Sequence, residues 1–231
     1  MNLDINISRA VRTIAVLVLI LINAGTAWNY AKAAESSSVI PDPAVDTPLA
    51  AKQGKQTAVL GGGCFWGVQE VFEHVKGVKD VISGYSGGSV ASPSYEQVST
   101  GRTDHAESVK ITFDPAKISY GQLLKVFFSV VHDPTQLNRQ GPDTGSQYRS
   151  VIFYVNDEQK HIAEAYIAQL EQARSFRDPI VTQVVPMTKF YDAELYHQNY
   201  ARFHPEDSYI ARNDAPKVER LREQFPDLYK K

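Results

Sequence analysis

Hydrophobic residues follow two different periods on either side of the stretch GGGCFWG, residues 61–67. Before it, Thr57–Leu60 is a short apolar run that ends in glycines, and such a run predicts a buried strand. After it, apolar residues recur at the i, i+3, i+4, i+7 spacing of an amphipathic helix that Gly77 ends: Val68, Val71, Phe72 and Val75. The pattern predicts a strand, a turn and a helix, with Cys64 where the turn meets the helix.

The rest of the chain repeats these two periods. Polar and apolar residues alternate from Glu107 to Phe113, which predicts a strand whose buried face carries Val109, Ile111 and Phe113. Further strands are predicted over 78–85, 151–155 and 180–185, and helices over 119–131, 156–174, 193–201 and 218–228. Because strands and helices alternate imperfectly, we expect an α/β (α+β) fold, a two-layer sandwich with a central mixed sheet such as the ferredoxin-like plait, rather than a doubly wound one.

One segment, residues 132–148, follows neither period: HDPTQLNRQGPDTGSQY. A run of 17 residues without periodicity is unusual inside a compact domain. Loops of this length are usually either functional or disordered.

The amino-terminal residues have the features of an export signal. Arg9 and Arg12 precede an apolar run, Ile14–Ile22, of nine residues, which is far shorter than the ~20 that span a bilayer. Residues 1–33 are therefore predicted to be a signal peptide, and the alternative is an uncleaved anchor formed by residues 13–28. In both cases we expect an exported protein, periplasmic or extracytoplasmic.

Small residues after the apolar run offer two cleavage sites, Ala31–Ala33, which fits the A-x-A pattern, and Gly25–Ala27. Residues 34–55 are rich in Ser, Pro, Ala and Asp without any period, and this composition predicts a disordered linker. A single folded domain is expected over 56–212, followed by an amphipathic helical tail, 213–231, that packs on it.

Composition narrows the class of protein. The chain has 231 residues, 43% of them hydrophobic, which is enough for one sizeable core. Its net charge is −2 with both signs interspersed, so the basic block typical of nucleic-acid binding is absent from the sequence. We expect a monomer that binds no nucleic acid.

The single cysteine, Cys64, excludes an intrachain disulfide and any four-cysteine metal site. Its alternative role is that of a small buried hydrophobic residue. Its position at a predicted helix start favours a reactive thiol, because free N–H groups there stabilise a thiolate. The preceding glycines let a substrate approach the backbone closely, and Phe65 and Trp66 could form an apolar wall beside the sulfur.

Glu107 lies on the buried face of its predicted strand, if the strand begins that early. A carboxyl group there should have a raised pKa and stay protonated near neutral pH. The pattern leaves equally open that the strand begins later and that Glu107 is solvated.

Several motifs in order resemble the peptide methionine sulfoxide reductases of type A, over roughly residues 56–211. The motifs are Gly63–Trp66, GYSGG at 84–88, Pro93–Tyr95, His105–Glu107, His132–Pro134, Arg139–Gly141 with Asp143, Gly145–Arg149, and Phe190–Tyr191 with His197–Gln198. Enzymes of this type repair methionine sulfoxide in proteins. The resemblance implies a catalytic domain that reduces the S epimer in methionine-sulfoxide-containing proteins and peptides.

The resemblance also implies a role for each matched site residue. Cys64 would be the nucleophile, Glu107 the acid, and Asp143 an organiser of the site. Phe65 and Trp66 would hold the substrate's S-methyl group. The sulfoxide oxygen would accept hydrogen bonds from two hydroxyls, those of Tyr95 and Tyr148.

The single cysteine departs from many family members, which carry further cysteines that resolve the sulfenic acid formed on the nucleophile. We therefore expect no bound cofactor and an external thiol reductant, thioredoxin-like or glutaredoxin-like, acting on Cys64 directly.

Three other functions remain possible from the pattern. A secreted cysteine hydrolase would pair Cys64 with His197 and Asn213, although the second cysteine of the papain-type motif is missing. An exported peptide-binding module would use the Phe65–Trp66 wall without chemistry. A zinc site is suggested only by His105-x-Glu107, and its Cys-x-x-Cys half is absent, so no metal is predicted.

Overall fold

A computed structural model describes residues 40–231. The predicted signal peptide or anchor and the first part of the predicted linker lie outside the described residues. Within 40–231, no helix has both the length and the apolar character needed to cross a membrane.

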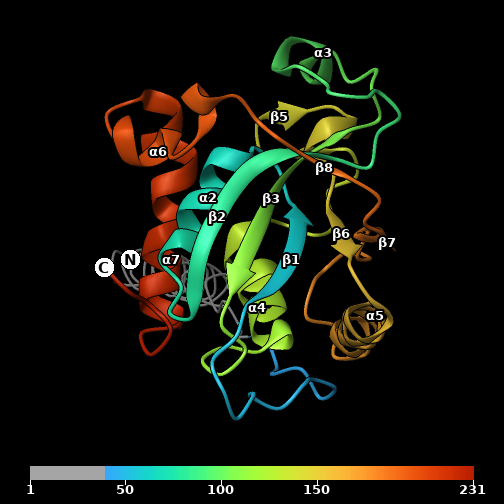
Figure 1. Cartoon of the computed structure of the whole chain (residues 1–231), viewed down its shortest axis with the longest axis vertical. Coiled ribbons are helices and arrows are strands. Elements are labelled where there is room, and N and C mark those ends of the chain that lie inside the picture. The colour runs from blue at the N-terminus through green and yellow to red at the C-terminus, as the bar shows by residue number, and fades with distance from the viewer. Residues whose placement is uncertain (1–39) are drawn as a thin grey trace, which may run out of the picture. The chain divides into compact units, whose positions relative to one another are not determined.

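The centre of the fold is a six-stranded mixed sheet (Figure 1) with the strand order β7-β6-β1-β3-β2-β8. The strands are β1 (Gln56–Gly61), β2 (Val78–Ser86), β3 (Ala106–Phe113), β6 (Val151–Tyr154), β7 (Gln183–Pro186) and β8 (Phe190–Asp192). Only the β6–β7 pair of this sheet is parallel. The four central strands come in the chain order 4-1-3-2 of a ferredoxin-like plait, so the predicted fold class is confirmed.

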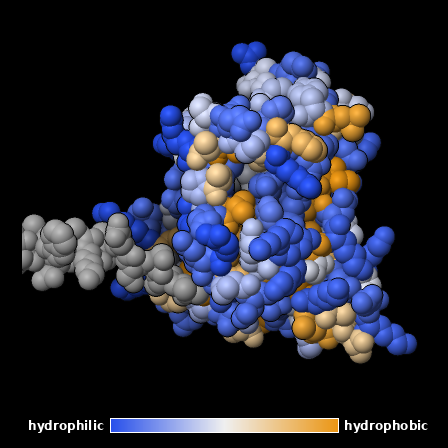
Figure 2. Space-filling model, turned by 90° about the vertical axis from the view of Figure 1, so that its left-hand side faces the viewer, coloured by the Kyte–Doolittle hydropathy of each residue, from blue (hydrophilic) through white to orange (hydrophobic). Residues whose placement is uncertain are grey.

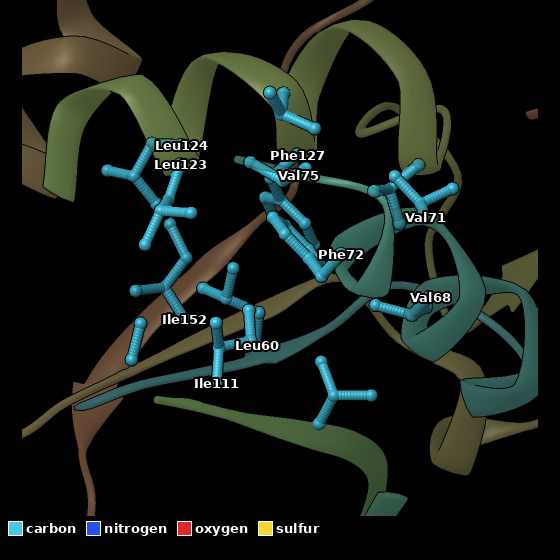
Figure 3. Packing of buried hydrophobic residues seen from close by; sticks show 14 of the residues in the cluster. Leu60, Val68, Val71, Phe72, Val75, Ile111, Leu123, Leu124, Phe127 and Ile152 are labelled. Carbon is cyan, nitrogen blue, oxygen red and sulfur yellow. The ribbon is translucent and has the colours of Figure 1, made fainter. Parts of the chain in front are cut away.

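Two helices, α2 (Phe65–Glu73) and α4 (Tyr120–Val126), pack on one face of this sheet. The residues between them form the main core (Figure 3): Leu60, Ile111 and Ile152 from the strands, Val68, Val71, Phe72 and Val75 from α2 and the residues after it, and Leu123, Leu124 and Phe127 from α4 and the turn after it. The apolar stripe of α2 predicted from the sequence is therefore the surface that covers β2 and β3. Helix α5 (Asp157–Gln172) follows β6 and contributes Ile162, Ala163, Tyr166 and Leu170 to the same core.

The register of β1 and β3 fixes which side chains face the helices. Leu60 pairs with Val109 and Ala58 with Ile111, and all four are fully buried in the main core. Val59, one position away, belongs to a smaller cluster on the opposite face. Because side chains alternate along a strand, the same register turns Glu107 toward the helices.

Several elements differ from the predicted ones. Two short elements have too few residues for a visible period, namely α3 (Tyr95–Ser99) and β8. The loop 132–148 contains a small hairpin, β4 (Arg139–Gln140) with β5 (Asp143–Thr144), and a helical turn, η2 (Ser146–Tyr148). The helix predicted over 193–201 is instead a turn, η3 (Leu195–His197), and a short helix, α6 (Tyr200–Phe203).

The described part of the predicted linker, residues 40–55, has no helix or strand, but it lies against the domain. Ile40 is 6% exposed, and the Tyr166 hydroxyl donates to the Pro41 carbonyl at 2.8 Å. Asp46 accepts hydrogen bonds from the Ser119 hydroxyl and from the Gly121 N–H. The expectation of disorder fails here because composition reports local propensity, whereas these contacts come from residues far away in sequence.

The carboxyl-terminal tail folds onto α2. After a π-type turn, η4 (Ile210–Asp214), it forms α7 (Ala215–Gln224), with Leu221 fully buried. The Lys76 N–H donates to the Leu228 carbonyl and the Lys230 N–H to the His74 carbonyl. The side of the molecule that carries α6 and α7 is mainly hydrophilic with separate apolar spots (Figure 2), so the tail turns its polar face outward.

Candidate active site

Cys64 is the N-cap residue of α2, directly after a glycine turn. Gly63 has φ = +92°, a conformation that favours glycine, and a Cβ there would lie 2.7 Å from Gln140 of the hairpin. Cys64 is 8% exposed. The glycines thus let β4 cross close to the backbone beside the thiol.

The first two N–H groups of α2 serve the two groups expected to react. The Phe65 N–H donates to Glu107 Oε2 at 3.1 Å, and the Trp66 N–H lowers the pKa of Cys64. A helix N-terminus has these donors free and carries a partial positive charge. One turn of helix therefore connects the thiol with the carboxyl group.

The thiol is less acidic than its helix position alone predicts. Burial is the largest influence and raises the pKa of Cys64, and the charges of Glu107 and Asp214 raise it further. The Trp66 N–H and Lys217 lower it, but they do not outweigh burial. At neutral pH the resting residue is therefore a thiol.

Glu107 is buried, 2% exposed, because β3 begins at Ala106, early enough to include it, which decides between the two alternatives that the pattern left open. Burial raises the pKa of Glu107 to about 8, against the opposing effect of the Phe65 N–H, and the charges of Asp143 and Asp214 raise it as well. The carboxyl group is therefore mostly protonated at neutral pH and can donate a proton.

Tyr95, Tyr148 and Asp143 come from three separate segments and meet at this site. Burial raises the pKa of both tyrosine hydroxyls, and both respond to the charges of Glu107 and Cys64. Asp143 Oδ2 accepts a hydrogen bond from the Tyr209 hydroxyl. The structure thus brings the five predicted reacting and organising residues into one electrostatic environment.

Phe65 and Trp66, the two residues predicted to form the apolar wall, differ in burial and in packing. Phe65 is 1% exposed and packs in the core against Tyr85 and His197, with ring centroids 5.8 and 5.1 Å away. Trp66 is only partly buried and is stacked on Tyr200, with centroids 3.9 Å apart and an interplanar angle of 16°. Trp66 is thus the more accessible apolar surface of the pair.

His197 holds the Trp66 ring in place. Trp66 Nε1 donates to His197 Nδ1 at 3.1 Å, so the remaining ring proton of neutral His197 is on Nε2. Burial lowers the pKa of His197, which keeps it neutral. The matched motifs include His197 but imply no role for it, and no period in the sequence marks Tyr200 or Tyr209.

The segment that carries His197 is fixed to β2 by amide side chains. Gln198 accepts from the Ser83 N–H and donates to the Ser83 carbonyl, in the manner of a neighbouring strand. Gln69 of α2 donates to the Val81 carbonyl and accepts from the Asn199 N–H. These bonds connect α2, β2 and the His197 segment beneath Trp66.

The hydrolase and zinc arrangements are not formed. His197 binds Trp66 rather than Cys64, and Asn213 Nδ2 donates to the Tyr209 carbonyl. Both ring nitrogens of His105 already have backbone partners, the Gly88 N–H and the Val90 carbonyl. Among residues 40–231, no group of three or more His, Cys, Asp or Glu side chains is suited to holding a metal.

This combination of a plait with a thiol at a helix start and a protonated carboxyl beside it fits a thiol-based oxidoreductase. The family model described as peptide methionine sulfoxide reductase matches residues 56–229. The chain is 57% identical over 179 residues to the peptide methionine sulfoxide reductase MsrA 2 of Mesorhizobium japonicum, covering 78% of this chain and 92% of that one. It is 53% identical over 196 residues to the MsrA 2 of Synechocystis, covering 84% of this chain and 92% of the relative.

Solved structures similar to this chain belong to the same family. Reduced Mxr1 from Saccharomyces cerevisiae has a TM-score of 0.58 at 32% identity, covering 71% of this chain and 92% of that one. Methionine sulfoxide reductase A of Corynebacterium diphtheriae has a TM-score of 0.57 at 34% identity, covering 72% and 84%. The chain belongs to the peptide methionine sulfoxide reductase family and is an oxidoreductase.

Proposed function

We propose that this enzyme reduces methionine-S-sulfoxide in oxidised proteins and peptides, and also the free amino acid, with Cys64 as the nucleophile. The observation that carries the proposal is the first turn of α2, where the Phe65 N–H binds the protonated Glu107 next to the buried Cys64 thiol. Selectivity for the S epimer is supported by the resemblance of the matched motifs.

The reaction balances with these two groups alone. The Cys64 sulfur attacks the sulfoxide sulfur while Glu107 transfers its proton to the sulfoxide oxygen. The S–O bond breaks, the hydroxyl passes to Cys64, and methionine leaves with the sulfur lone pair. The thiol proton restores Glu107, so one thiol and one sulfoxide give one sulfenic acid and one thioether.

The hydroxyls of Tyr95 and Tyr148 act on the same oxygen. Negative charge develops there as sulfur is attacked, and donors directed at developing charge stabilise the transition state. Both hydroxyls remain protonated at neutral pH because burial raises their pKa values. Trp66, held by His197 and Tyr200, offers the apolar surface for the S-methyl group.

Recycling requires thiols from outside the chain, because Cys64 is its single cysteine. A first thiol attacks the sulfenic sulfur, forms a mixed disulfide and releases water. A second thiol then releases Cys64 and becomes part of the departing disulfide. We propose a thioredoxin-like or glutaredoxin-like reductant.

We also propose that the enzyme is exported as a monomer, directed by the basic and apolar residues before residue 33. Amino-terminal sequencing of the protein recovered from outside the cytoplasm tests export. A mature terminus near residue 28 or 34 supports cleavage, and an intact terminus in the membrane fraction supports the anchor. Sedimentation of the mature protein tests the monomer.

A single turnover without added reductant tests the chemistry. The enzyme is mixed with a peptide that contains racemic methionine sulfoxide, and both are followed by mass spectrometry. We expect one methionine per enzyme, from the S epimer only, and one added oxygen on Cys64. Cys64→Ser is the matched control and should form none; methionine formation by that variant, or equal use of both epimers, contradicts the proposal.

A further inference from the structure

The tail carries a buried ion pair that its amphipathic pattern does not predict. Lys217 Nζ lies 3.0 Å from Asp214 Oδ1, and the side chains are 11% and 0% exposed. Lysine and aspartate are seldom so buried unless they are paired. The pair lies where the inward face of an amphipathic tail would carry apolar residues.

The pair lies against the first turn of α2. A Cβ at Gly67 would be 2.0 Å from Asp214 Oδ1 and 2.9 Å from Lys217 Nζ, so both charged groups occupy the space that a side chain would fill. Gly67 is three residues after Cys64. The absence of a side chain at Gly67 thus admits a carboxylate and an ammonium group beneath the helix start.

Stability does not explain this pair well. Asp214 Oδ2 is buried without any hydrogen-bond partner in the described structure, so the carboxylate is only half satisfied. Buried ion pairs often contribute no more stability than apolar residues of similar size, because both charges lose their hydration. A role beyond packing is therefore expected.

Cys64 responds to both members of the pair, in opposite directions. Asp214 disfavours the thiolate and Lys217 favours it. Glu107 also influences Cys64, and three hydroxyls respond to the cysteine in turn: Tyr95, Tyr148 and Tyr209. Asp143 and Glu70 influence Asp214, and Lys217 also influences His132.

We propose that Asp214 and Lys217 are positioning residues of the active site, which set the ionisation of the Cys64 thiol from beneath the first turn of α2. Asp214 holds the ammonium group at Gly67, and the ammonium group offsets the negative charges around the sulfur. The tail thereby supplies charge to the reacting cysteine. This inference rests on Cys64 as the nucleophile of the proposed function, but its test uses the thiol alone.

The experiment measures the alkylation rate of Cys64 by iodoacetamide against pH in the full chain, with mass spectrometry as the readout. Lys217→Met should move the midpoint upward by about half to one pH unit, which slows alkylation about three- to tenfold below the midpoint. Asp214→Asn keeps an oxygen that accepts the hydrogen bond from Lys217 but loses the negative charge, so it should move the midpoint downward. Lys217→Arg, which keeps the charge, should restore most of the wild-type profile.

Arg220→Met is the matched control. Arg220 lies on the same helix and donates to the Val130 carbonyl, and it is not among the groups with the largest influence on Cys64. Its loss should weaken the packing of the tail and leave the midpoint unchanged. All variants are repeated with Glu107→Gln, so that titration of Glu107 does not mask the thiol.

Equal losses of melting temperature in Lys217→Met and Arg220→Met, with the wild-type midpoint in both, would overturn the proposal. If Lys217→Met does not fold, the nearly isosteric Asp214→Asn decides, and an unchanged midpoint there overturns the proposal as well. Because alkylation requires no sulfoxide, either result is distinct from a failure of the reductase reaction.

Discussion

Strand β3 has a shielded carboxyl group at each end. Glu107 is its second residue and is 2% exposed, and Asp114 follows its last residue and is 1% exposed. Their pKa values nevertheless move in opposite directions. Burial raises the pKa of Glu107 to about 8, whereas hydrogen bonds hold the pKa of Asp114 below its ordinary value.

The difference lies in the donors that surround each group and in how deeply each group is buried. The Gly54 and Ala116 N–H groups donate to Asp114 Oδ1 at 3.0 and 3.2 Å, and Lys79 lies 3.4 Å from Oδ2. Glu107 has one backbone donor, the Phe65 N–H, and its charged neighbours are acidic. Donors stabilise a carboxylate and burial without them disfavours it, so one end of β3 carries a charged anchor and the other, more deeply buried end carries a carboxyl group that keeps its proton.

The largest effect is expected from Glu107→Gln. Gln keeps an oxygen for the Phe65 N–H but cannot transfer a proton, so the single-turnover rate should fall by about 100- to 10,000-fold, the range for general acid catalysis. Binding of the sulfoxide peptide should change little. Asp114→Asn is the control and should keep the wild-type rate; a wild-type rate in Glu107→Gln at neutral pH would show that Glu107 is not the acid.

The two groups should also give opposite pH dependences of stability. The folded state holds the Glu107 proton up to about pH 8, so its contribution is present at low pH and is lost as the pH rises toward 8, at about 1.4 kcal/mol for each pKa unit. The pKa of Asp114 is lowered in the folded state, so Asp114 stabilises the protein at pH values above its pKa in the unfolded state. This stabilisation is lost as the pH falls through its pKa in the folded state.

Urea unfolding at a series of pH values measures both slopes. Glu107→Gln should flatten the decline between about pH 5 and 8, and Asp114→Asn should flatten the loss in acid. The reduction rate of the wild-type enzyme should fall as the pH rises through about 8, because the acid ionises. If Glu107→Gln instead flattens the loss of stability in acid, and Asp114→Asn the decline toward pH 8, the charge states are assigned to the wrong groups.

A smaller effect is expected from Asp114→Asn at neutral pH. The neutral amide keeps the backbone donors but weakens the bonds that were charge-assisted, so the melting temperature should fall by a few degrees without loss of activity. Limited proteolysis in the 50–55 region should become faster, because the Gly54 N–H anchors that segment to Asp114. Unchanged melting and proteolysis would show that Asp114 anchors nothing.

The smallest effect is expected from Lys79→Met. Lys79 is 36% exposed, and its ion pair with Asp114 is partly screened by water. The Gly54 N–H is the largest influence on Asp114, so the melting temperature should fall less than it does in Asp114→Asn. A larger fall would mean that the ammonium group, rather than the backbone, keeps Asp114 charged.

The sequence predicted one of these two carboxyl groups and not the other. Alternation from Glu107 to Phe113 offered an inward Glu107 as one of two alternatives, because a period of two is a property of the strand itself, and the burial of Glu107 decides for it. The anchoring of Asp114 depends on Gly54, 60 residues earlier in a segment without any period. No local pattern carries that information.

The same distinction separates the predicted and missed parts of the site. The turn before Cys64 and the helix after it follow from local glycines and apolar spacing. Asp214 and Lys217 interrupt the apolar face of a helix, and only the space left by Gly67 accommodates them. Helix α3 was missed although Ser94 and Gln97 form a capping box like that of Ser119 and Gln122, because five residues are too few for a period.

The stacking of Trp66 on Tyr200 also gives the enzyme an optical reporter. The chain has two tryptophans, Trp28 and Trp66, and Trp28 lies within the predicted signal peptide. In a protein cleaved after Ala33, Trp66 would therefore be the sole indole fluorophore, two residues from the sulfur that changes its oxidation state. Its emission should follow each turnover in real time in a stopped-flow instrument, without any label on the enzyme or its substrate.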